Sequence, residues 1–256
     1  MKMPDLSFFL MVVLCTALFI FLVHKFKALT VSGTVSAVVL GLLIISCAGF
    51  NAIWPLVIFL AGSILTGRIK PESPVRSDHK SSRPRDAVQV WSNGGIYGIA
   101  AFLYAITGDY YFLICMAVSI SVSTADTWSS ETGTRLGGFT FDPFRLRKVS
   151  PGVSGGMSFS GTMAGITGAA IMAVMTNFIF GFISKYLLVF AAGITGMLLD
   201  TFLGSQFQKK YLDQESGEWV DTSKTYSDER GLSFVTNDFV NLLSNLITTV
   251  IFYFVA

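Results

Sequence analysis

Apolar runs long enough to cross a bilayer as helices make up most of this sequence. They lie at residues 6–23, 29–49, 52–67, 90–107, 110–126, 156–180, 184–204 and 234–255. A transmembrane helix needs about 20 apolar residues, so the third and fifth runs are marginal. Only 13% of the 256 residues are charged, about half the share found in soluble domains. The sequence therefore predicts an all-α, polytopic integral membrane protein with about eight transmembrane helices, or seven.

The basic residues indicate how these helices are oriented. Of the 18 Lys and Arg residues, 16 follow odd-numbered runs, and only Lys2 and Lys185 fall on the other side. Cytoplasmic loops carry an excess of Lys and Arg. We therefore expect both termini to be extracytoplasmic and the whole chain, residues 1–256, to form a single transmembrane domain. The expected cytosolic loops are the long polar segments near 68–89, 127–155 and 205–233.

Polar residues gather where five of these helices meet the predicted cytosolic face. They are Gln89 and Asn93; Asp126, Thr127, Ser129, Ser130 and Glu131; Gly152, Ser154, Gly155, Gly156 and Ser158; Asp200, Thr201, Ser205, Gln206 and Gln208; and Asn237, Asn241 and Asn245. An acidic residue at the bilayer centre costs about 2.5–3.5 kcal/mol on insertion scales, so such residues indicate a functional site. We expect a polar active-site cluster at the cytosolic face.

Asp126, Glu131 and Asp200 are the candidate metal ligands. These hard oxygen donors suit Mg²⁺, because that ion binds through one or two carboxylates, waters and substrate phosphates. On an ideal helix, Asp126 and Glu131 lie about 140° apart, so they converge only if the helix ends between them. The Ser-Ser pair and the glycine within 129–133 favour such an end. The alternative is that Asp126 is satisfied by neighbouring hydroxyls.

A glycine-rich segment, SPGVSGGMSFSGTMAG at 150–165, precedes and begins the sixth helix. Glycine lets backbone N–H groups approach a ligand, and a helix N-terminus favours anions. We interpret the segment as a phosphate cradle formed by Gly152, Ser154, Gly155 and Gly156, beside Lys148. The alternative is a face of small residues for helix packing. Gly161, Gly165 and Gly168 fit that alternative.

The remaining candidates are amides and cations. Asn237, Asn241 and Asn245 recur at every fourth position, and such amide stripes commonly join helices. The cytosolic position of the first two favours the site for them. Arg85, Lys148 and Lys209 are candidates to clamp phosphate groups. The two histidines stand alone, which disfavours a Ser-His-Asp hydrolase, whereas phosphoryl transfer asks little of a base.

Six ordered motifs resemble one membrane family. They are QVWSNGG (89–95), ADTWSSETG (125–133), GVSGGMSFSG (152–161), LLDTFLGSQFQ (198–208), DQESG (213–217) and NDFVNLLSN (237–245). Over residues 28–256 the chain resembles the family containing plant phytyl-phosphate kinase and the animal transmembrane protein nineteen. The resemblance implies phosphorylation of an isoprenoid monophosphate, of prenyl or phytyl type, to its diphosphate. The phosphate donor would be a nucleoside triphosphate, CTP or ATP.

We therefore expect a Mg²⁺-dependent kinase of a prenyl-phosphate lipid whose active site faces the cytosol. The expected catalytic residues are Asp126, Glu131, Asp200, Arg85 and Lys148. The expected substrate-binding and nucleotide-binding residues are Gln89, Asn93, Thr127, Ser130, Gly152, Ser154, Gly155, Gly156, Gln206, Lys209, Asn237 and Asn241. The expected partners are this substrate and membrane lipid, without nucleic acid, and a homo-oligomer is compatible with the sequence.

The alternative function is a carrier or flippase for a phosphorylated polyprenyl lipid. A carrier of this kind needs polar groups at mid-membrane and on both sides, and the outer halves of the runs offer almost none. A CDP-alcohol transferase is disfavoured because its D-G-x-x-A-R motif is absent.

Overall fold

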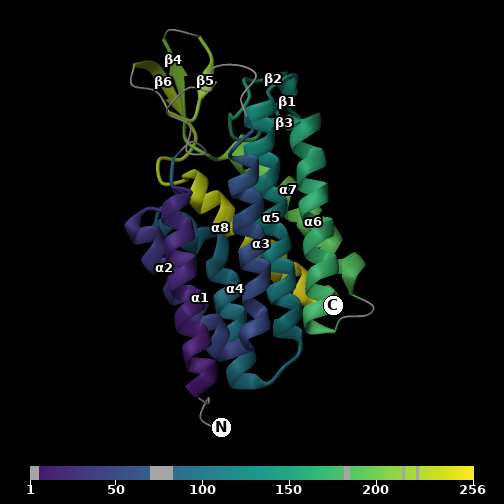
Figure 1. The fold of residues 1–256 in the computed structure, drawn as a ribbon. Helices are drawn as coiled ribbons and strands as arrows, with labels where there is room; N and C mark the ends of the chain where they lie inside the picture. The colour runs from purple at the N-terminus through teal and green to yellow at the C-terminus, as the bar shows by residue number, and fades with distance from the viewer. Residues whose placement is uncertain (1–5, 70–82, 182–184, 215–216, 223–224) are drawn as a thin grey trace.

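The computed structural model describes residues 6–69, 83–181, 185–214, 217–222 and 225–256. Within these residues, eight α-helices form one bundle, and two small sheets lie at one end of it (Figure 1). The helices are α1 (Leu6–Lys25), α2 (Val31–Ala48), α3 (Trp54–Thr66), α4 (Ala87–Thr107), α5 (Tyr111–Leu136), α6 (Phe159–Phe180), α7 (Tyr186–Gln206) and α8 (Asn237–Val255). A 3₁₀ turn, η1 (Phe50–Ile53), precedes α3. The predicted fold class, a mostly helical membrane protein, is confirmed.

Six of the described helices are long and apolar enough to cross a membrane, namely α1, α2, α5, α6, α7 and α8. The apolar stretch formed by η1 and α3 is shorter. Helix α4 has 21 residues, but its glycines and its polar first turns lower its hydropathy. The total of eight crossings therefore stays a prediction.

Helix α5 lies at the centre of the bundle and packs against α3, α4, α6, α7 and α8. Every residue from Leu113 to Ala125 is buried. Its neighbours approach closely because they present glycines to it. A Cβ at Gly196 of α7 would lie 2.5 Å from Val122, and one at Gly165 of α6 would lie 2.8 Å from the Ala125 carbonyl oxygen. Such contacts between small residues are how membrane helices pack without a hydrophobic driving force.

Two antiparallel sheets, which the sequence did not predict, occupy the polar connections. The first contains β1 (Thr140–Asp142), β2 (Arg147–Lys148) and β3 (Met157–Ser158) in the order β2-β1-β3. The second contains β4 (Lys210–Asp213), β5 (Trp219–Val220) and β6 (Tyr226–Arg230) in the order β5-β4-β6. Strands of two to five residues are too short to show a clear alternation of apolar and polar residues.

The C-terminal end of α5 differs from the one that the sequence predicted. The helix continues without a break to Leu136, whereas the sequence predicted an end near residue 126. It ends at Gly137, whose φ is 60° and whose N–H donates to the Gly133 carbonyl. The helix end expected between Asp126 and Glu131 is therefore absent, so these two carboxylates cannot converge on one metal by that route.

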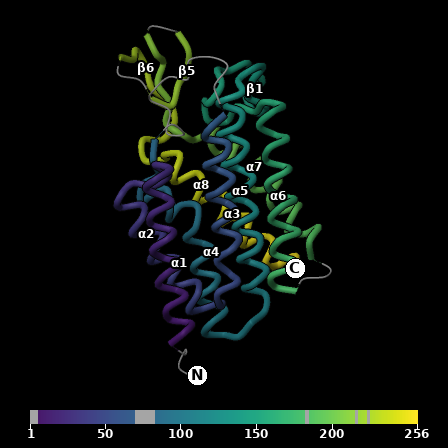
Figure 2. Tube along the Cα trace, viewed as in Figure 1, coloured from purple at the N-terminus to yellow at the C-terminus, as the bar shows by residue number. Residues whose placement is uncertain are grey.

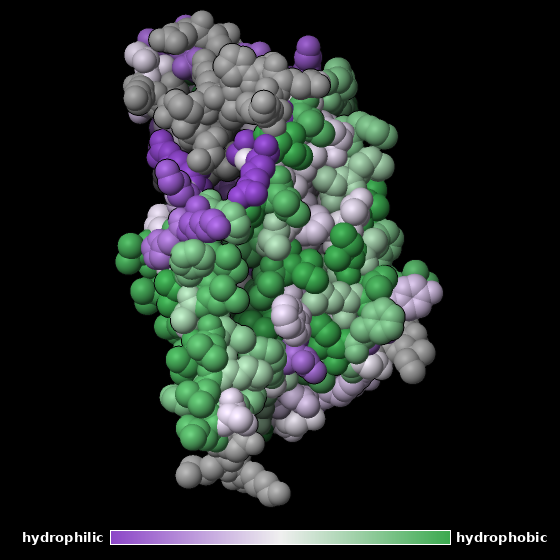
Figure 3. Space-filling model, in the orientation of Figure 1, coloured by the Kyte–Doolittle hydropathy of each residue, from purple (hydrophilic) through white to green (hydrophobic). Residues whose placement is uncertain are grey.

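The two ends of the bundle differ in chemistry. The start of α1 and the end of α8 lie away from the sheets, towards the opposite end of the bundle (Figure 2). Apolar residues cover the visible face of the helices, whereas hydrophilic residues gather near the sheet end (Figure 3). This arrangement fits the predicted topology, in which the sheets belong to the cytosolic loops.

The topology predicts which positions a membrane-impermeant maleimide reaches. In a variant whose three cysteines are replaced by serine, we expect Lys148→Cys and Ser227→Cys to be labelled only from the cytosolic side. We expect Asn51→Cys, in η1, to be labelled only from outside. The measurement compares intact cells with inverted vesicles, and labelling of Lys148→Cys in intact cells would contradict the orientation.

Candidate functional site

A polar cavity of about 400 Å³ lies where the helices meet the two sheets. Of the seventeen site residues expected from the sequence, fifteen line it: Arg85, Gln89, Asn93, Asp126, Thr127, Ser130, Glu131, Gly152, Ser154, Gly155, Gly156, Asp200, Lys209, Asn237 and Asn241. The structure does not place the other two in its lining. Lys148 is exposed on β2, and the Gln206 amide donates to Ser205 Oγ at 3.1 Å.

The carboxylates of Asp126 and Asp200 lie within hydrogen-bonding range of each other in this cavity. The packing of α5 on α7 explains why they meet. Val122 contacts Gly196 across the two helices, and each aspartate lies four residues further along its own helix, on the same face. Two carboxylates this close repel each other unless a proton or a cation lies between them. The pair is therefore the position in the cavity best suited to a cation.

Helix α8 completes the surroundings of Asp200. Ser244 Oγ donates to Asp200 Oδ2 at 3.0 Å. Asn241, with its amide in the orientation that satisfies both neighbours, places its nitrogen 3.2 Å from the same oxygen. In contrast, Asn245 donates to the Ser119 carbonyl and to Ser123 Oγ, which joins α8 to α5. Of the asparagines in this stripe, Asn245 therefore joins two helices, whereas Asn241 contacts Asp200 at the cavity.

The donor set around the aspartates fits Mg²⁺ better than a softer metal. Among the described residues, no three His, Cys, Asp or Glu side chains converge to form a complete metal site. Mg²⁺ does not need one, because it is usually held by one or two carboxylates together with waters and substrate phosphates. Asp126 and Asp200 would hold such an ion from the α5–α7 side of the cavity.

Glu131 is occupied by other contacts. It forms a buried ion pair with Arg85, with Oε1 2.6 Å from Nη2. Its carboxylate also accepts hydrogen bonds from Ser63 Oγ at 2.7 Å and Thr66 Oγ1 at 2.5 Å. These contacts tie α5 to α3 and to the start of α4. The structure therefore places Glu131 as a positioning group for Arg85 with its oxygens already occupied, whereas Asp126 lies against Asp200.

Arg85 is fixed at both its backbone and its side chain. Its backbone N–H donates to Ala28 O at 3.0 Å, and its carbonyl accepts from Thr30 N at 2.9 Å. The guanidinium lies over the ring of Phe59, 5.2 Å from its centroid. Nη1 is buried and has no hydrogen-bond partner among the described residues. A rigid guanidinium with one unused edge suits the oxygens of a phosphate group.

The glycine-rich loop binds a carboxylate of the protein itself, the side chain of Asp221. Ser154 N and Oγ donate to Asp221 Oδ2 at 3.0 and 2.7 Å. Lys210 Nζ donates to the Ser154 carbonyl. Gly152 and Gly155 have φ values of 86° and 83°, which favour glycine. A phosphate bound by the Ser154 N–H would have to displace Asp221, so the expected cradle is already partly occupied.

Packing by itself also explains one glycine of the expected cradle. A Cβ at Gly155 would lie 2.5 Å from Ser205 Cα, so the loop contacts the backbone of α7 directly. Gly156 is crowded by methyl groups of Val149 and Thr140, at 2.8 and 2.9 Å from its Cβ position. The alternative interpretation, close packing of small residues, thus accounts for Gly155 without a ligand.

A charged cluster that the sequence did not predict lies between the two sheets. It consists of Arg145, Arg147, Lys210 and Arg230 with Asp142 and Asp221. Burial lowers the pKa of Lys210 to about 8. Burial, followed by the charges of Arg147 and Arg145, lowers the pKa of Arg230 to about 10. In the sequence, these cations indicate only which loops are cytosolic. Nothing in their spacing predicts that two separate sheets bring them together.

The cluster also anchors the end of α7. Asp142 is fully buried and accepts from Ser205 Oγ at 2.9 and 2.8 Å. Arg145 Nε donates to the Ser205 carbonyl at 2.9 Å. These contacts fix the end of α7 one turn beyond Asp200. The sheets thus support the cavity that the helices form.

Residues 14–249 match the family described as "Integral membrane protein DUF92". The chain belongs to this family. It is 29% identical over 189 residues to a protein of Methanocaldococcus jannaschii named "Uncharacterized membrane protein MJ0933", covering 74% of this chain and 79% of that protein. No solved structure matches it.

A second relative of this DUF92 protein is "Uncharacterized membrane protein sll0875" of Synechocystis. The identity is 28% over 193 residues, which cover 72% of this chain and 74% of the relative. The names of both relatives support an integral membrane protein and state no reaction. The cavity must therefore supply the argument for function.

The ion pair predicts a strong, non-additive effect on stability. Arg85→Met leaves the largely buried Glu131 side chain without its cationic partner, and losing one partner of a fully buried pair costs about 3–5 kcal/mol, which is the upper bound here. We expect a large fall in melting temperature in detergent, and we expect Arg85→Met/Glu131→Met to recover much of it. Lys148→Met, at an exposed position, is the control and should melt like the wild type. Equal melting of Arg85→Met and wild type would contradict the described pair.

The Gly155 contact predicts a second difference in stability. Gly155 and Gly138 have the same φ of 83°, but only Gly155 faces another backbone, since nothing lies within 4 Å of a Cβ at Gly138. Both alanine variants pay about 1–2 kcal/mol for the left-handed conformation. We expect Gly155→Ala to lower the melting temperature well beyond Gly138→Ala. Equal shifts would show that the loop does not pack on α7 as described.

Proposed function

We propose that this DUF92 protein is a Mg²⁺-dependent kinase that converts a prenyl monophosphate into the diphosphate. The observation that carries the proposal is the Asp126–Asp200 pair, which faces a polar cavity surrounded by cationic groups. The six motifs that resemble the phytyl-phosphate kinase family support the choice of substrate. The donor would be ATP or CTP, bound from the side of the sheets.

The reaction balances without a general base. One oxygen of the prenyl phosphate attacks the γ-phosphorus of the nucleotide, the bond from that phosphorus to the β-γ bridging oxygen breaks, and a nucleoside diphosphate leaves. A phosphate monoester has its second pKa near 6, so at neutral pH the attacking oxygen is already largely deprotonated. The described residues that line the polar cavity include no histidine, and phosphoryl transfer depends mainly on positioning and electrostatics.

The residues in and around the polar cavity would divide the work of this reaction as follows. Asp126 and Asp200 would hold Mg²⁺, which supplies charge neutralisation between the two phosphate groups. Arg85 would direct its unused Nη1 edge to a phosphate oxygen, with Glu131 holding its other edge. Asn241 and Ser244 keep Asp200 oriented. Lys209, which lines the cavity, would assist with the nucleotide phosphates.

A carrier for a phosphorylated lipid is the second candidate, and one observation favours it. Polar side chains continue from the cavity deeper into the bundle, from Ser123 to Asn245 and on to Thr249. A transport path needs polar groups at this depth. However, all three residues are buried and bonded to one another, as expected for groups that join helices. The kinase therefore remains the stronger proposal.

The kinase proposal predicts loss of activity when either aspartate is neutralised. Purified protein with Mg²⁺, ATP or CTP, and labelled geranylgeranyl monophosphate should yield the diphosphate. Asp126→Asn and Asp200→Asn should each lower the rate by about 100-fold or more, by analogy with the removal of a group that stabilises the transition state. Asp109→Asn, in the α4–α5 connection at the other end of the bundle, is the matched control and should keep the wild-type rate.

A second readout does not depend on turnover. Mg²⁺ should raise the melting temperature of the wild type, because an ion that binds only the folded state stabilises it. It should have little effect on Asp126→Asn. If wild-type protein forms no diphosphate with any donor, yet moves prenyl phosphate across vesicles without nucleotide, the carrier is the correct function.

A further inference from the structure

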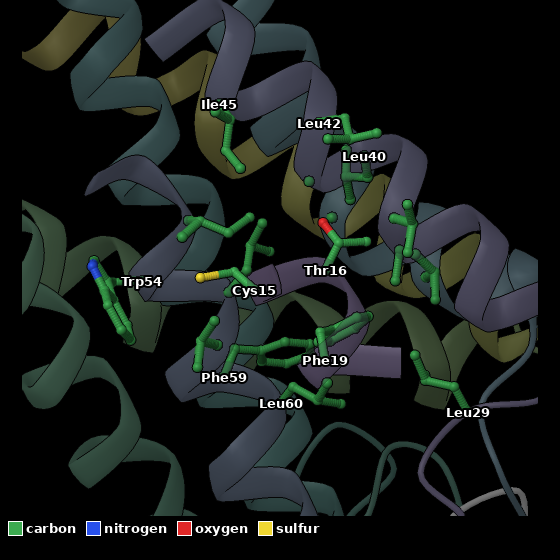
Figure 4. Close-up of a pocket in the computed structure, with 18 of the residues that line it drawn as sticks. Cys15, Thr16, Phe19, Leu29, Leu40, Leu42, Ile45, Trp54, Phe59 and Leu60 are labelled. Atoms are coloured by element: carbon green, nitrogen blue, oxygen red, sulfur yellow. The ribbon is translucent and has the colours of Figure 1, made fainter. Parts of the chain in front are cut away.

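A second cavity, of about 380 Å³, lies between α1, α2, α3 and α4 (Figure 4). Apolar side chains form most of its wall, among them Phe19 of α1, Leu40 of α2 and Phe59 of α3. Its volume lies near the lower end of the range for ligand pockets, about 300–1,000 Å³. This size fits one hydrocarbon chain better than the two chains of a diacyl lipid.

The two cavities share residues. Arg85 and Gln89 line both the apolar cavity and the polar cavity. Phe59, which lies under the Arg85 guanidinium, belongs to the apolar wall, and Glu131 on the other side of Arg85 belongs to the polar wall. A molecule that occupied both cavities would need an apolar tail and, at the level of Arg85, an anionic head group.

We propose that the apolar cavity binds the single hydrocarbon tail of the phosphorylated lipid whose head group occupies the polar cavity, with α1 as its outer wall. The phosphate chemistry of the head group rests on the proposed function, whereas the place of the tail rests on the cavity. Bulk membrane lipid could also enter an apolar cavity in a bilayer. The shared Arg85 favours an occupant that carries a phosphate, because an acyl chain alone would leave the buried Nη1 without a partner.

The packing of α1 supports its role as a wall. Of its described residues only Val23, near its C-terminal end, is buried. Thr16 and Phe19 are half-buried and face the cavity, as Figure 4 shows. The turn after α1 is joined to the start of α4 by the hydrogen bond from Arg85 N to Ala28 O. Helix α1 is thus fixed at the level of the head group and covers the space that the tail would fill.

The test fills the tail cavity and leaves the head-group cavity unchanged. Thr16→Phe and Ala37→Phe add bulk at lining positions on α1 and α2. The matched controls, Ala17→Phe and Val39→Phe, add the same bulk at exposed neighbouring positions outside the lining. Binding of labelled geranylgeranyl monophosphate and dimethylallyl monophosphate is measured with Mg²⁺ and without nucleotide, so failure of the kinase reaction does not affect the result.

We expect both filling variants to bind geranylgeranyl monophosphate at least 10-fold more weakly than the wild type, and to bind dimethylallyl monophosphate unchanged. The controls should bind both ligands like the wild type. Wild-type affinity of the filling variants for the long ligand would overturn the proposal. A parallel loss of the short ligand would also overturn it, because the variants would then act on the head-group cavity.

A measurement on the wild type covers the case in which a filling variant does not fold. A geranylgeranyl monophosphate analogue with a diazirine at the tail end should crosslink to peptides of α1, α2 or α3. Excess unlabelled geranylgeranyl monophosphate should prevent the crosslink, and the same amount of phosphatidic acid should not. Crosslinks confined to α6 or α7, or equal competition by phosphatidic acid, would overturn the proposal.

Discussion

The repulsion between Asp126 and Asp200 is the constraint on which the site depends. Two like charges about 4 Å apart repel by about 4 kcal/mol at an effective dielectric constant near 20, a large part of the net stability of a folded domain. The close packing of α7 on α5 brings the two aspartates together. This packing leaves no room for a local shift, because a side chain at Gly196, one turn before Asp200, would collide with Val122. Two carboxylates held together in this way need a proton or a cation between them, and the packing of α5 on α7 keeps that requirement in place.

The distribution of charge around that pair then defines what else the cavity can hold. Arg85 lies just before α4 and is held by Glu131, and further cations gather behind the glycine-rich loop between the two sheets. Clefts with an excess of one sign of charge concentrate ligands of the opposite sign. A membrane-bound phosphate and a soluble nucleotide are both anionic, and they can meet only at the membrane surface. The cavity lies where the bundle meets its polar loops, which is the location that such a reaction requires.

The parts of this protein that the sequence predicts well are those determined by hydropathy and by position along the chain. Apolar runs predicted the helices, and polar residues at helix ends predicted most of the cavity lining. The end of α5 was missed because its last turns carry Ser, Thr and Glu, which resemble a loop in composition. In the structure Glu131 and Thr132 are buried, and Glu131 pairs with residues of α3 and with Arg85, just before α4, all of them distant in sequence. Hydropathy along one segment cannot reveal a partner on another.

The same limit explains the errors around the loops. Lys148 precedes the glycines in sequence, which favours it as a site residue, but it is exposed on β2, whereas Lys210 is buried against Ser154. Asp221, more than 60 residues from the glycine-rich loop, supplies the anion that the loop binds. Both facts depend on how the β4–β6 sheet lies against the loop, and strand pairing between short segments leaves little trace in one sequence.

The position of Arg85 connects these observations. A Cβ at Gly33 of α2 would lie 2.2 Å from the Arg85 carbonyl oxygen, so the start of α2 packs directly on the backbone of residue 85. The turn between α1 and α2 is hydrogen-bonded to the same residue on both sides, through Ala28 and Thr30. Because the Arg85 guanidinium is also bound to Glu131 on the central helix, Arg85 connects the turn between α1 and α2 to the walls of both the apolar and the polar cavity.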